Sequence, residues 1–200
     1  MTVDLLIKDA FLYIDRDWEV ANGWLAIKDG RVHGIGDRVE DAPAARSVIS
    51  AHGRLVTPGL VNAHHHMYQN LTRAYAPVTN GTLFEWLKGL YPLWADLDEE
   101  SVYLSTCVAM VELLMGGCTT SMDHMYVHPR PFLIDAQFRA ARDIGFRFHA
   151  TRGSMTRSVE DGGLPPASVV QDEDTILADS ERLVGAFHDP APGAMGRVAL

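Results

Sequence analysis

Residues 55–66 read Leu-Val-Thr-Pro-Gly-Leu-Val-Asn-Ala-His-His-His, an apolar run that ends in three histidines. The part from Val56 to Ala63 is apolar almost throughout, which is typical of a fully buried strand in a parallel sheet. Because alternate side chains of an extended segment share a face, we expect His64 and His66 to point the same way and His65 the opposite way. Neutral imidazole is a common ligand of zinc and other divalent metals. The segment therefore predicts half of a metal site, and the alternative is a histidine cluster that binds no metal.

After residue 56, strand-like runs alternate with helical periods. A capping box at Thr82–Glu85 and a capping Asp98 predict two helix starts, and the periods at 131–145 and 176–187 predict two more helices. The apolar face expected for the helix after Asp98 consists of Tyr103, Cys107, Met110, Val111 and Leu114. Strands are expected at 118–122, at 146–150 and from 196 onward. This alternation predicts an α/β fold with a parallel sheet and right-handed crossovers.

Residues 3–55 have a different pattern, that of short strands. The pair Asp29-Gly30 stands between two apolar runs and predicts a hairpin, because Gly adopts positive φ freely. We therefore predict two domains, a small β unit at residues 1–55 and a larger α/β unit at residues 56–200.

Composition restricts the classes of partner and compartment. The chain has 26 acidic and 17 basic residues, a net charge of −9, which argues against nucleic acid or an anionic membrane surface as partner. Cys107 and Cys118 are the only cysteines, so a reducing compartment is the simpler expectation. No secretory signal is recognisable, and no apolar run approaches the roughly 18 residues of a membrane helix. We expect a cytoplasmic protein.

The segment at 53–66 resembles the first barrel strand of the amidohydrolase superfamily. The resemblance continues through Gln69, through Thr-Leu-Phe-Glu-Trp-Leu at 82–87 and through Gly-Cys-Thr-Thr-Ser-Met-Asp-His at 117–124. It is strongest to the branch that holds purine deaminases and triazine hydrolases. It implies the first half of a (β/α)8 barrel, strands one to four, in residues 56–200, with a small flanking N-terminal β-sandwich portion in residues 1–55.

In such barrels the active site lies at the carboxyl ends of the strands. The resemblance implies that His64 and His66 bind one divalent metal, zinc or alternatively iron, which lowers the pKa of a bound water to roughly 7. The remaining ligands and the acid-base carboxylates are expected beyond residue 200. Asp123 and His124, expected just after the second strand, either orient a ligand imidazole or are structural.

Three further residues are candidates for substrate binding. Gln69 matches a family position that binds the purine edge, and the alternative is a surface amide without a role. Trp86 matches a position that lines the base pocket, although a Trp on a short helix is often plain core. Arg152 follows the third strand and could form a forked contact with a ring carbonyl or an anion, or could form a structural ion pair.

The resemblance implies a metal-dependent aminohydrolase that replaces a ring amino group of a purine by oxygen. The expected substrates are 8-oxoguanine, giving urate, or guanine, giving xanthine. The alternatives are a triazine or aminopyrimidine hydrolase, or a non-catalytic metal-binding fragment. We expect a small-molecule substrate, no nucleic acid or membrane partner, and a homo-oligomer.

Overall fold

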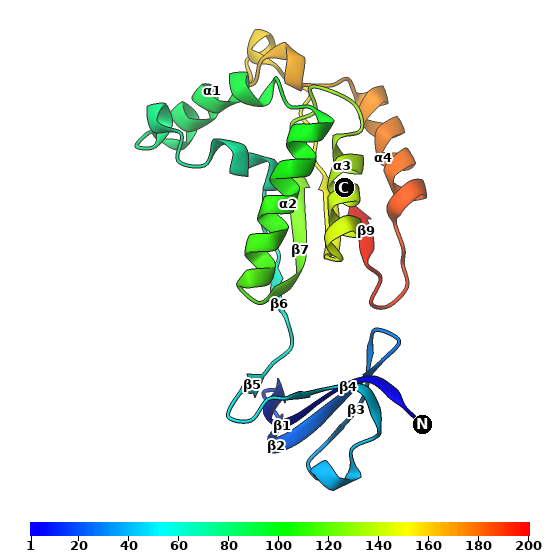
Figure 1. The fold of residues 1–200 in the computed structure, drawn as a ribbon. Coiled ribbons are helices and arrows are strands. Elements are labelled where there is room, and N and C mark those ends of the chain that lie inside the picture. Colours follow the sequence, from blue (N-terminus) through cyan, green and yellow to red (C-terminus); the bar gives the residue numbers. More distant parts are fainter. The chain divides into compact units, whose positions relative to one another are not determined.

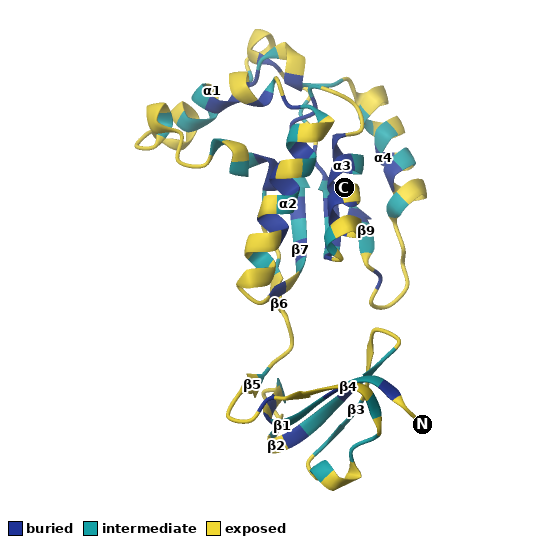
Figure 2. Ribbon diagram, in the orientation of Figure 1, coloured by how far each residue is buried: buried dark blue, intermediate teal, exposed yellow.

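The computed structural model describes residues 1–200 and divides them into two compact units, Met1–Pro58 and Gly59–Leu200. Each unit has its own sheet and its own buried residues (Figure 1, Figure 2). The sequence-based boundary falls between residues 55 and 56. In the structure Val56 pairs with Leu12 of the first sheet and so belongs to the first unit.

The first unit is a five-stranded sheet in the order β3-β2-β1-β4, with β5 also pairing with β1. Its strands are β1 (Val3–Asp15), β2 (Trp18–Lys28), β3 (Arg31–Gly36), β4 (Ala45–Ser50) and β5 (Leu55–Val56). The turn between β2 and β3 is the predicted hairpin. Asp29 has φ 51° and Gly30 has φ 71°, the positive values that a two-residue type I′ turn requires. Strand β1 is longer than the short strands expected in residues 3–55, and its pairing with β2 shifts around Asp9.

The second unit is a four-stranded parallel sheet in the order β6-β7-β8-β9. Its strands are β6 (Leu60–Asn62), β7 (Cys118–Met125), β8 (Arg147–Arg152) and β9 (Gly196–Ala199). Its α-helices are α1 (Leu83–Trp94), α2 (Glu99–Met115), α3 (Leu133–Ile144) and α4 (Glu173–Phe187), and short 3-10 helices occupy residues 67–72, 76–78, 159–161 and 167–169. The predicted alternation of strands and helices in a parallel sheet is confirmed. None of these helices has both the length and the apolar character needed to cross a bilayer.

The expectation of one buried strand from Val56 to Ala63 is wrong. Strand β5 ends at Val56, and β6 begins only at Leu60, on the other side of Pro58 and Gly59. Proline has no N–H to donate to a ladder, so the pairing is interrupted there. Leu60 is 62% exposed, so β6 is not the fully buried strand that was expected.

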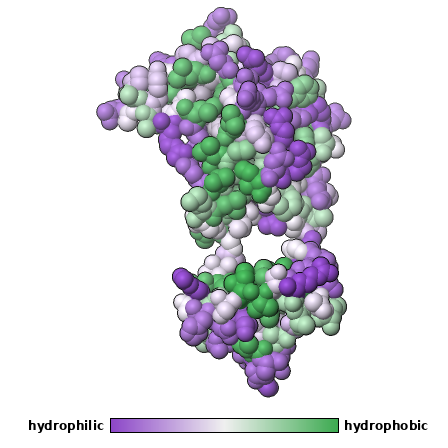
Figure 3. All heavy atoms as spheres, viewed as in Figure 1, coloured by the Kyte–Doolittle hydropathy of each residue, from purple (hydrophilic) through white to green (hydrophobic).

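Helix α2 has the predicted start but not the predicted buried face. Asp98 accepts a hydrogen bond from the Ser101 amide at its start, and Gly116 caps its end. Its buried residues are Val102, Ser105, Thr106, Ala109 and Met110, so only Met110 of the expected face is buried. The helix is apolar on nearly every side, and the periodicity therefore could not identify the packed face. Figure 3 shows hydrophobic atoms gathered over the surface that α2 presents, where Leu104, Val108 and Val111 are exposed.

Two strands run further than expected. Strand β7 extends to Met125 and β8 to Arg152, so Asp123, His124 and Arg152 lie within strands rather than in the loops that follow. Helix α3 begins later than expected, at Leu133, because Phe132 has φ 64° and breaks the helical path after Pro131.

Candidate metal centre

His64 and His66 lie together, directly after β6. Their ring centroids are 5.1 Å apart and the ring planes meet at 89°. The neighbouring strand β7 brings His124 and Tyr126 to the same edge, with ring centroids 5.5 and 5.4 Å from that of His66. Parallel strands present their carboxyl ends at one edge of the sheet, which is why residues about 60 positions apart meet here.

A main-chain contact determines which nitrogen of His66 is free. The Nδ1 of His66 lies 2.6 Å from the carbonyl oxygen of His124. A carbonyl only accepts, so Nδ1 carries the proton and Nε2 keeps its lone pair. Ligand imidazoles in metal sites use one nitrogen in this way while the other binds the metal. His64 is exposed, and its amide donates to Asn62 Oδ1 at 3.0 Å.

His65 does not join the pair. Its carbonyl accepts from the His124 amide at 2.9 Å, and its Nδ1 lies 4.0 Å from Asp123 Oδ1 without a hydrogen-bond partner. Burial, followed by the charge of His66, lowers the pKa of His65. The neighbouring Asp123 is fully buried, and this desolvation raises its pKa to about 7 despite hydrogen bonds from Gln137 and Met67.

The residues present fit a metal in part. Two imidazoles, one with its second nitrogen held by a carbonyl, match the donor type that zinc prefers. No group of three or more His, Cys, Asp or Glu side chains in residues 1–200 lies close enough to hold a metal. The chain therefore offers two candidate ligands, fewer than the three that a catalytic zinc site takes from its protein.

Gln69 lies in the 3-10 helix that follows the histidines. Its main-chain N–H donates to the main-chain carbonyl of His66 at 3.0 Å, and its side-chain Nε2 donates to the Tyr68 hydroxyl at 3.4 Å. Tyr126 also belongs to this cluster. Burial raises its pKa, and hydrogen bonds with Tyr68 and Gln69 act in the opposite direction. The sequence analysis missed Tyr126, although the spacing His124-x-Tyr126 near the end of a strand places both side chains on one face.

Trp86 lies on α1 among aromatic core residues. Its ring centroid is 5.3 Å from that of Trp94, and it packs at the edge of the main hydrophobic cluster. No ring contact joins it to His64 or His66 in the described residues. This placement favours the core alternative, and a role in a base pocket stays a prediction.

Arg152 is buried and held by protein acceptors. Its Nε donates to Asp179 at 3.2 Å, its Nη1 to the Gly153 carbonyl at 3.0 Å and its Nη2 to Gln171 at 2.6 Å. Each guanidinium nitrogen thus already has a partner. The geometry favours the structural ion pair, and contact with a substrate stays a prediction.

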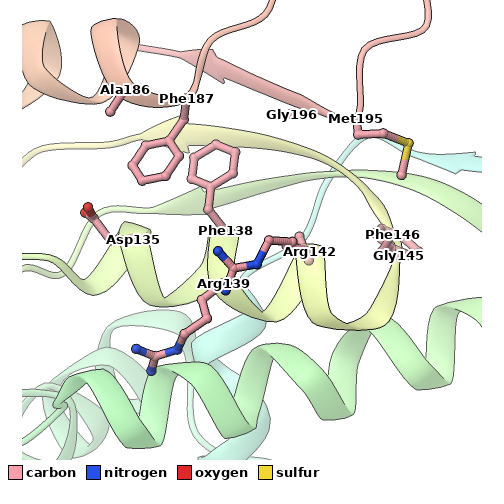
Figure 4. A pocket seen from close by; sticks show the side chains of 11 residues that line it. Asp135, Phe138, Arg139, Arg142, Gly145, Phe146, Ala186, Phe187, Met195 and Gly196 are labelled. Carbon is pink, nitrogen blue, oxygen red and sulfur yellow. The ribbon is translucent and has the colours of Figure 1, made fainter.

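A separate cavity of about 570 Å³ lies between α3, the end of α4 and the start of β9. Figure 4 shows Phe138 and Phe187 side by side in it, and their rings stack with centroids 4.3 Å apart. Phe146 and Gly196, which also line it, lie at the amino ends of β8 and β9. The cavity is therefore at the opposite end of the sheet from the histidines and is no part of the metal centre.

Comparison with known proteins identifies the family. Residues 55–200 match the family model described as the Amidohydrolase family. The chain belongs to this family. It is 49% identical to 8-oxoguanine deaminase from Pseudomonas aeruginosa over 90% of this chain and 41% of that protein. It is 41% identical to hydroxydechloroatrazine ethylaminohydrolase from Pseudomonas sp. (strain ADP), over 88% of this chain and 39% of that protein.

The fold is similar to that of a solved member. Atrazine chlorohydrolase TrzN from Arthrobacter aurescens TC1, crystallised with zinc, superposes with a TM-score of 0.89 and 28% identity. The match covers 98% of this chain and 46% of that one. The chain thus spans about 40% of the length of the two curated relatives. The predicted membership of the amidohydrolases is confirmed.

Proposed function

We propose that the protein is a metal-dependent aminohydrolase that replaces a ring amino group of a purine by oxygen, with 8-oxoguanine or guanine as substrate. Its four parallel strands would form the first half of a (β/α)8 barrel, and residues 1–58 would form part of a flanking β-sandwich. The observation that carries the proposal is the pair His64 and His66 at the strand end, with Nδ1 of His66 hydrogen-bonded to the His124 carbonyl.

His64 and His66 would be the zinc ligands contributed by this chain. A zinc ion, when bound, lowers the pKa of its water to about 7 and so makes hydroxide available at neutral pH. The His124 carbonyl holds the proton on Nδ1 of His66 and keeps Nε2 free as the donor nitrogen. We place the other ligands and the acid-base carboxylates after residue 200, because the relatives are more than twice as long as this chain.

Gln69 would bind the edge of the heterocycle. An amide offers both a donor and an acceptor, which suits the alternating polar atoms of a purine. The contact of Gln69 with Tyr68, and the position of Tyr126 beside it, would hold this amide close to His66.

The purine assignment rests on the higher identity to the 8-oxoguanine deaminase than to the triazine-related enzyme. A triazine hydrolase is the second candidate, supported by the high TM-score to the atrazine chlorohydrolase. A cytoplasmic location, a homo-oligomeric state and the absence of nucleic-acid partners remain predictions.

The test uses the full-length gene product, purified with its native metal. Metal content is measured for the wild type and for His64→Ala and His66→Ala, and ammonia release is followed with guanine, 8-oxoguanine and an amino-substituted triazine. We expect about one metal per chain in the wild type, its loss in both variants, and kcat/KM at least tenfold higher for a purine. Preference for the triazine would support the second candidate, and full metal content in either variant would refute the assigned ligands. Metal binding without turnover of any of these substrates would support the non-catalytic alternative.

A further inference from the structure

A buried polar network lies directly behind the histidine pair. Asp123 on β7 has no exposed surface. Its Oδ1 accepts the amide N–H of Met67 at 2.6 Å, and its Oδ2 accepts Nε2 of Gln137 at 2.7 Å. Gln137, on α3, is also fully buried. Both carboxylate oxygens are thus engaged by N–H donors from the protein.

The carbonyl of Met67 is held as firmly as its amide. The hydroxyl of Ser105, on α2, donates to that carbonyl, and both residues are buried. Side chains from β7 and α2 therefore satisfy the two main-chain polar groups of Met67. A buried peptide group left without partners is costly, so this peptide is strongly fixed in place.

Met67 is the residue that follows His66. His66 is therefore held at two points, at its ring by the His124 carbonyl and at its C-terminal neighbour by Asp123 and Ser105. Metal ligands need such support, because a small displacement of an imidazole weakens coordination.

We propose that Asp123 is a positioning residue for the metal centre, which acts through the peptide of Met67, together with Gln137 and Ser105, to hold His66 in its binding orientation. This inference rests on the proposed function, since it assumes that His66 binds the metal. The inference gives a reason for the buried Asp123 side chain. Burial of a carboxylate costs more folding free energy than burial of an apolar side chain of similar size.

The network also provides a conservative variant. In Asp123→Asn, the amide oxygen can still accept from the Met67 amide. The new NH2 group can donate to Oε1 of Gln137, which has no partner now, once the Gln137 amide turns over. Asp123→Ala removes both contacts. Ser121→Ala is the matched control, because Ser121 is buried on the same strand and its hydroxyl bonds only to the Met122 carbonyl.

The experiment measures three quantities for the full-length gene product and these variants: the zinc Kd by chelator competition, kcat and KM separately, and the thermal midpoint of the metal-free protein. We expect Asp123→Ala to weaken zinc binding by about 10- to 100-fold and to lower kcat more than it raises KM. The zinc Kd of Asp123→Asn should stay within about threefold of the wild-type value, and the zinc Kd of Ser121→Ala should equal the wild-type value; both changes are small beside the roughly 10- to 100-fold effect expected for Asp123→Ala.

An unchanged zinc Kd in folded Asp123→Ala would overturn the inference, and so would equal weakening in Asp123→Asn and Asp123→Ala. If Asp123→Ala does not fold, Ser105→Ala takes its place, since it removes only the hydroxyl on the Met67 carbonyl. A wild-type Kd in that variant would likewise overturn the inference. A wild-type protein that binds neither zinc nor iron would reject the proposed function itself, a result seen before any variant is compared.

Discussion

The ring of His66 donates from Nδ1 to the main-chain carbonyl of His124 at 2.6 Å, so one bond links the segment after β6 to β7. The side chain of His66 therefore has two separable tasks. Nδ1 joins the strands, and Nε2 is available for a metal.

These two tasks can be separated with His66→Asn and His66→Ala. The Nδ2 of asparagine can take the place of Nδ1 and donate to the His124 carbonyl, but nothing replaces the lone pair of Nε2. We expect both variants to lose metal, whereas only His66→Ala loses the hydrogen bond, worth about 1 kcal/mol of unfolding free energy. Metal analysis and denaturant unfolding of the metal-free full-length protein measure the two effects. Stoichiometric metal in His66→Asn would contradict the assignment of Nε2.

Much of the architecture is predictable from local signals. The hairpin at Asp29-Gly30 and the helix starts after Thr82 and Asp98 depend on residues within three positions of each other, and the structure has all three. The parallel sheet follows from the alternation of strands and helices. His64 and His66 are two positions apart in the sequence, and their rings lie side by side in the structure, as the extended segment predicts.

Sequence reasoning named Asp123 and Arg152 but could not identify their partners, which lie far away in the chain. The cost of burying Ser105 and Asp123 is offset by hydrogen bonds to Met67, which lies 38 and 56 positions away. Arg152 donates hydrogen bonds to Gln171 and Asp179, which lie 19 and 27 positions further along the chain. No periodic pattern encodes such pairings, and a helix that is apolar on all sides gives no indication of which face packs.

Gln69→Ala should impair substrate recognition. Loss of a hydrogen-bonding amide that contacts the heterocycle is expected to lower kcat/KM for the purine about tenfold, equivalent to about 1.4 kcal/mol. Metal content should be unchanged, because Gln69 is no ligand. The neighbouring Asn70→Ala is the control, since it removes an amide of the same 3-10 helix whose Oδ1 bonds to Arg73. A change of less than twofold in Gln69→Ala would remove this residue from the substrate site.

Arg152→Met should act on stability rather than on KM. Loss of Arg152 removes the only donor of Gln171 Oε1 and one donor of the Gly153 carbonyl, while Asp179 keeps its pair with Arg182, so we expect a cost of about 1–3 kcal/mol. Arg142→Met is the control, since its pair with Asp143 is exposed and such pairs contribute about 0–1 kcal/mol. Urea unfolding measures both. A raised KM in Arg152→Met with unchanged unfolding would instead support the substrate contact.

Gly153→Ala should disturb the histidine edge. A Cβ at residue 153 would lie 2.3 Å from Nε2 of His124 and 2.7 Å from Cβ of Tyr126, so one of these residues must move. Overpacking of this kind costs about 1–3 kcal/mol. We also expect weaker zinc binding, because the carbonyl of His124 supports His66. Gly185→Ala on α4 is the control, since its added Cβ would meet no atom within 4 Å beyond its chain neighbours and its own helix backbone. Equal stability and equal zinc affinity in both variants would contradict this account.

His128 should make the fold sensitive to acid. It is 7% exposed, and its Nε2 lies 3.1 Å from the carbonyls of both Met125 and Gly153, so that this nitrogen donates while the ring stays neutral. Burial, together with the charge of Arg152, lowers its pKa to about 4. The unfolded chain has a pKa near 6.5, so between these values it binds the proton that the folded chain excludes. The stabilisation is present above about pH 6.5 and is lost as the pH falls toward about 4, by roughly 3 kcal/mol in all.

His128→Gln tests this pH dependence. Its amide can still donate to a carbonyl but does not titrate in this range. We expect the unfolding free energy of the wild type to fall more steeply than that of the variant between pH 7 and pH 4.5, measured by urea unfolding of the full-length protein. All other ionisable groups are the same in the two proteins, so the difference between the two curves isolates His128. Parallel curves would show that His128 is not the group responsible, and the acid sensitivity of the fold would then have another source.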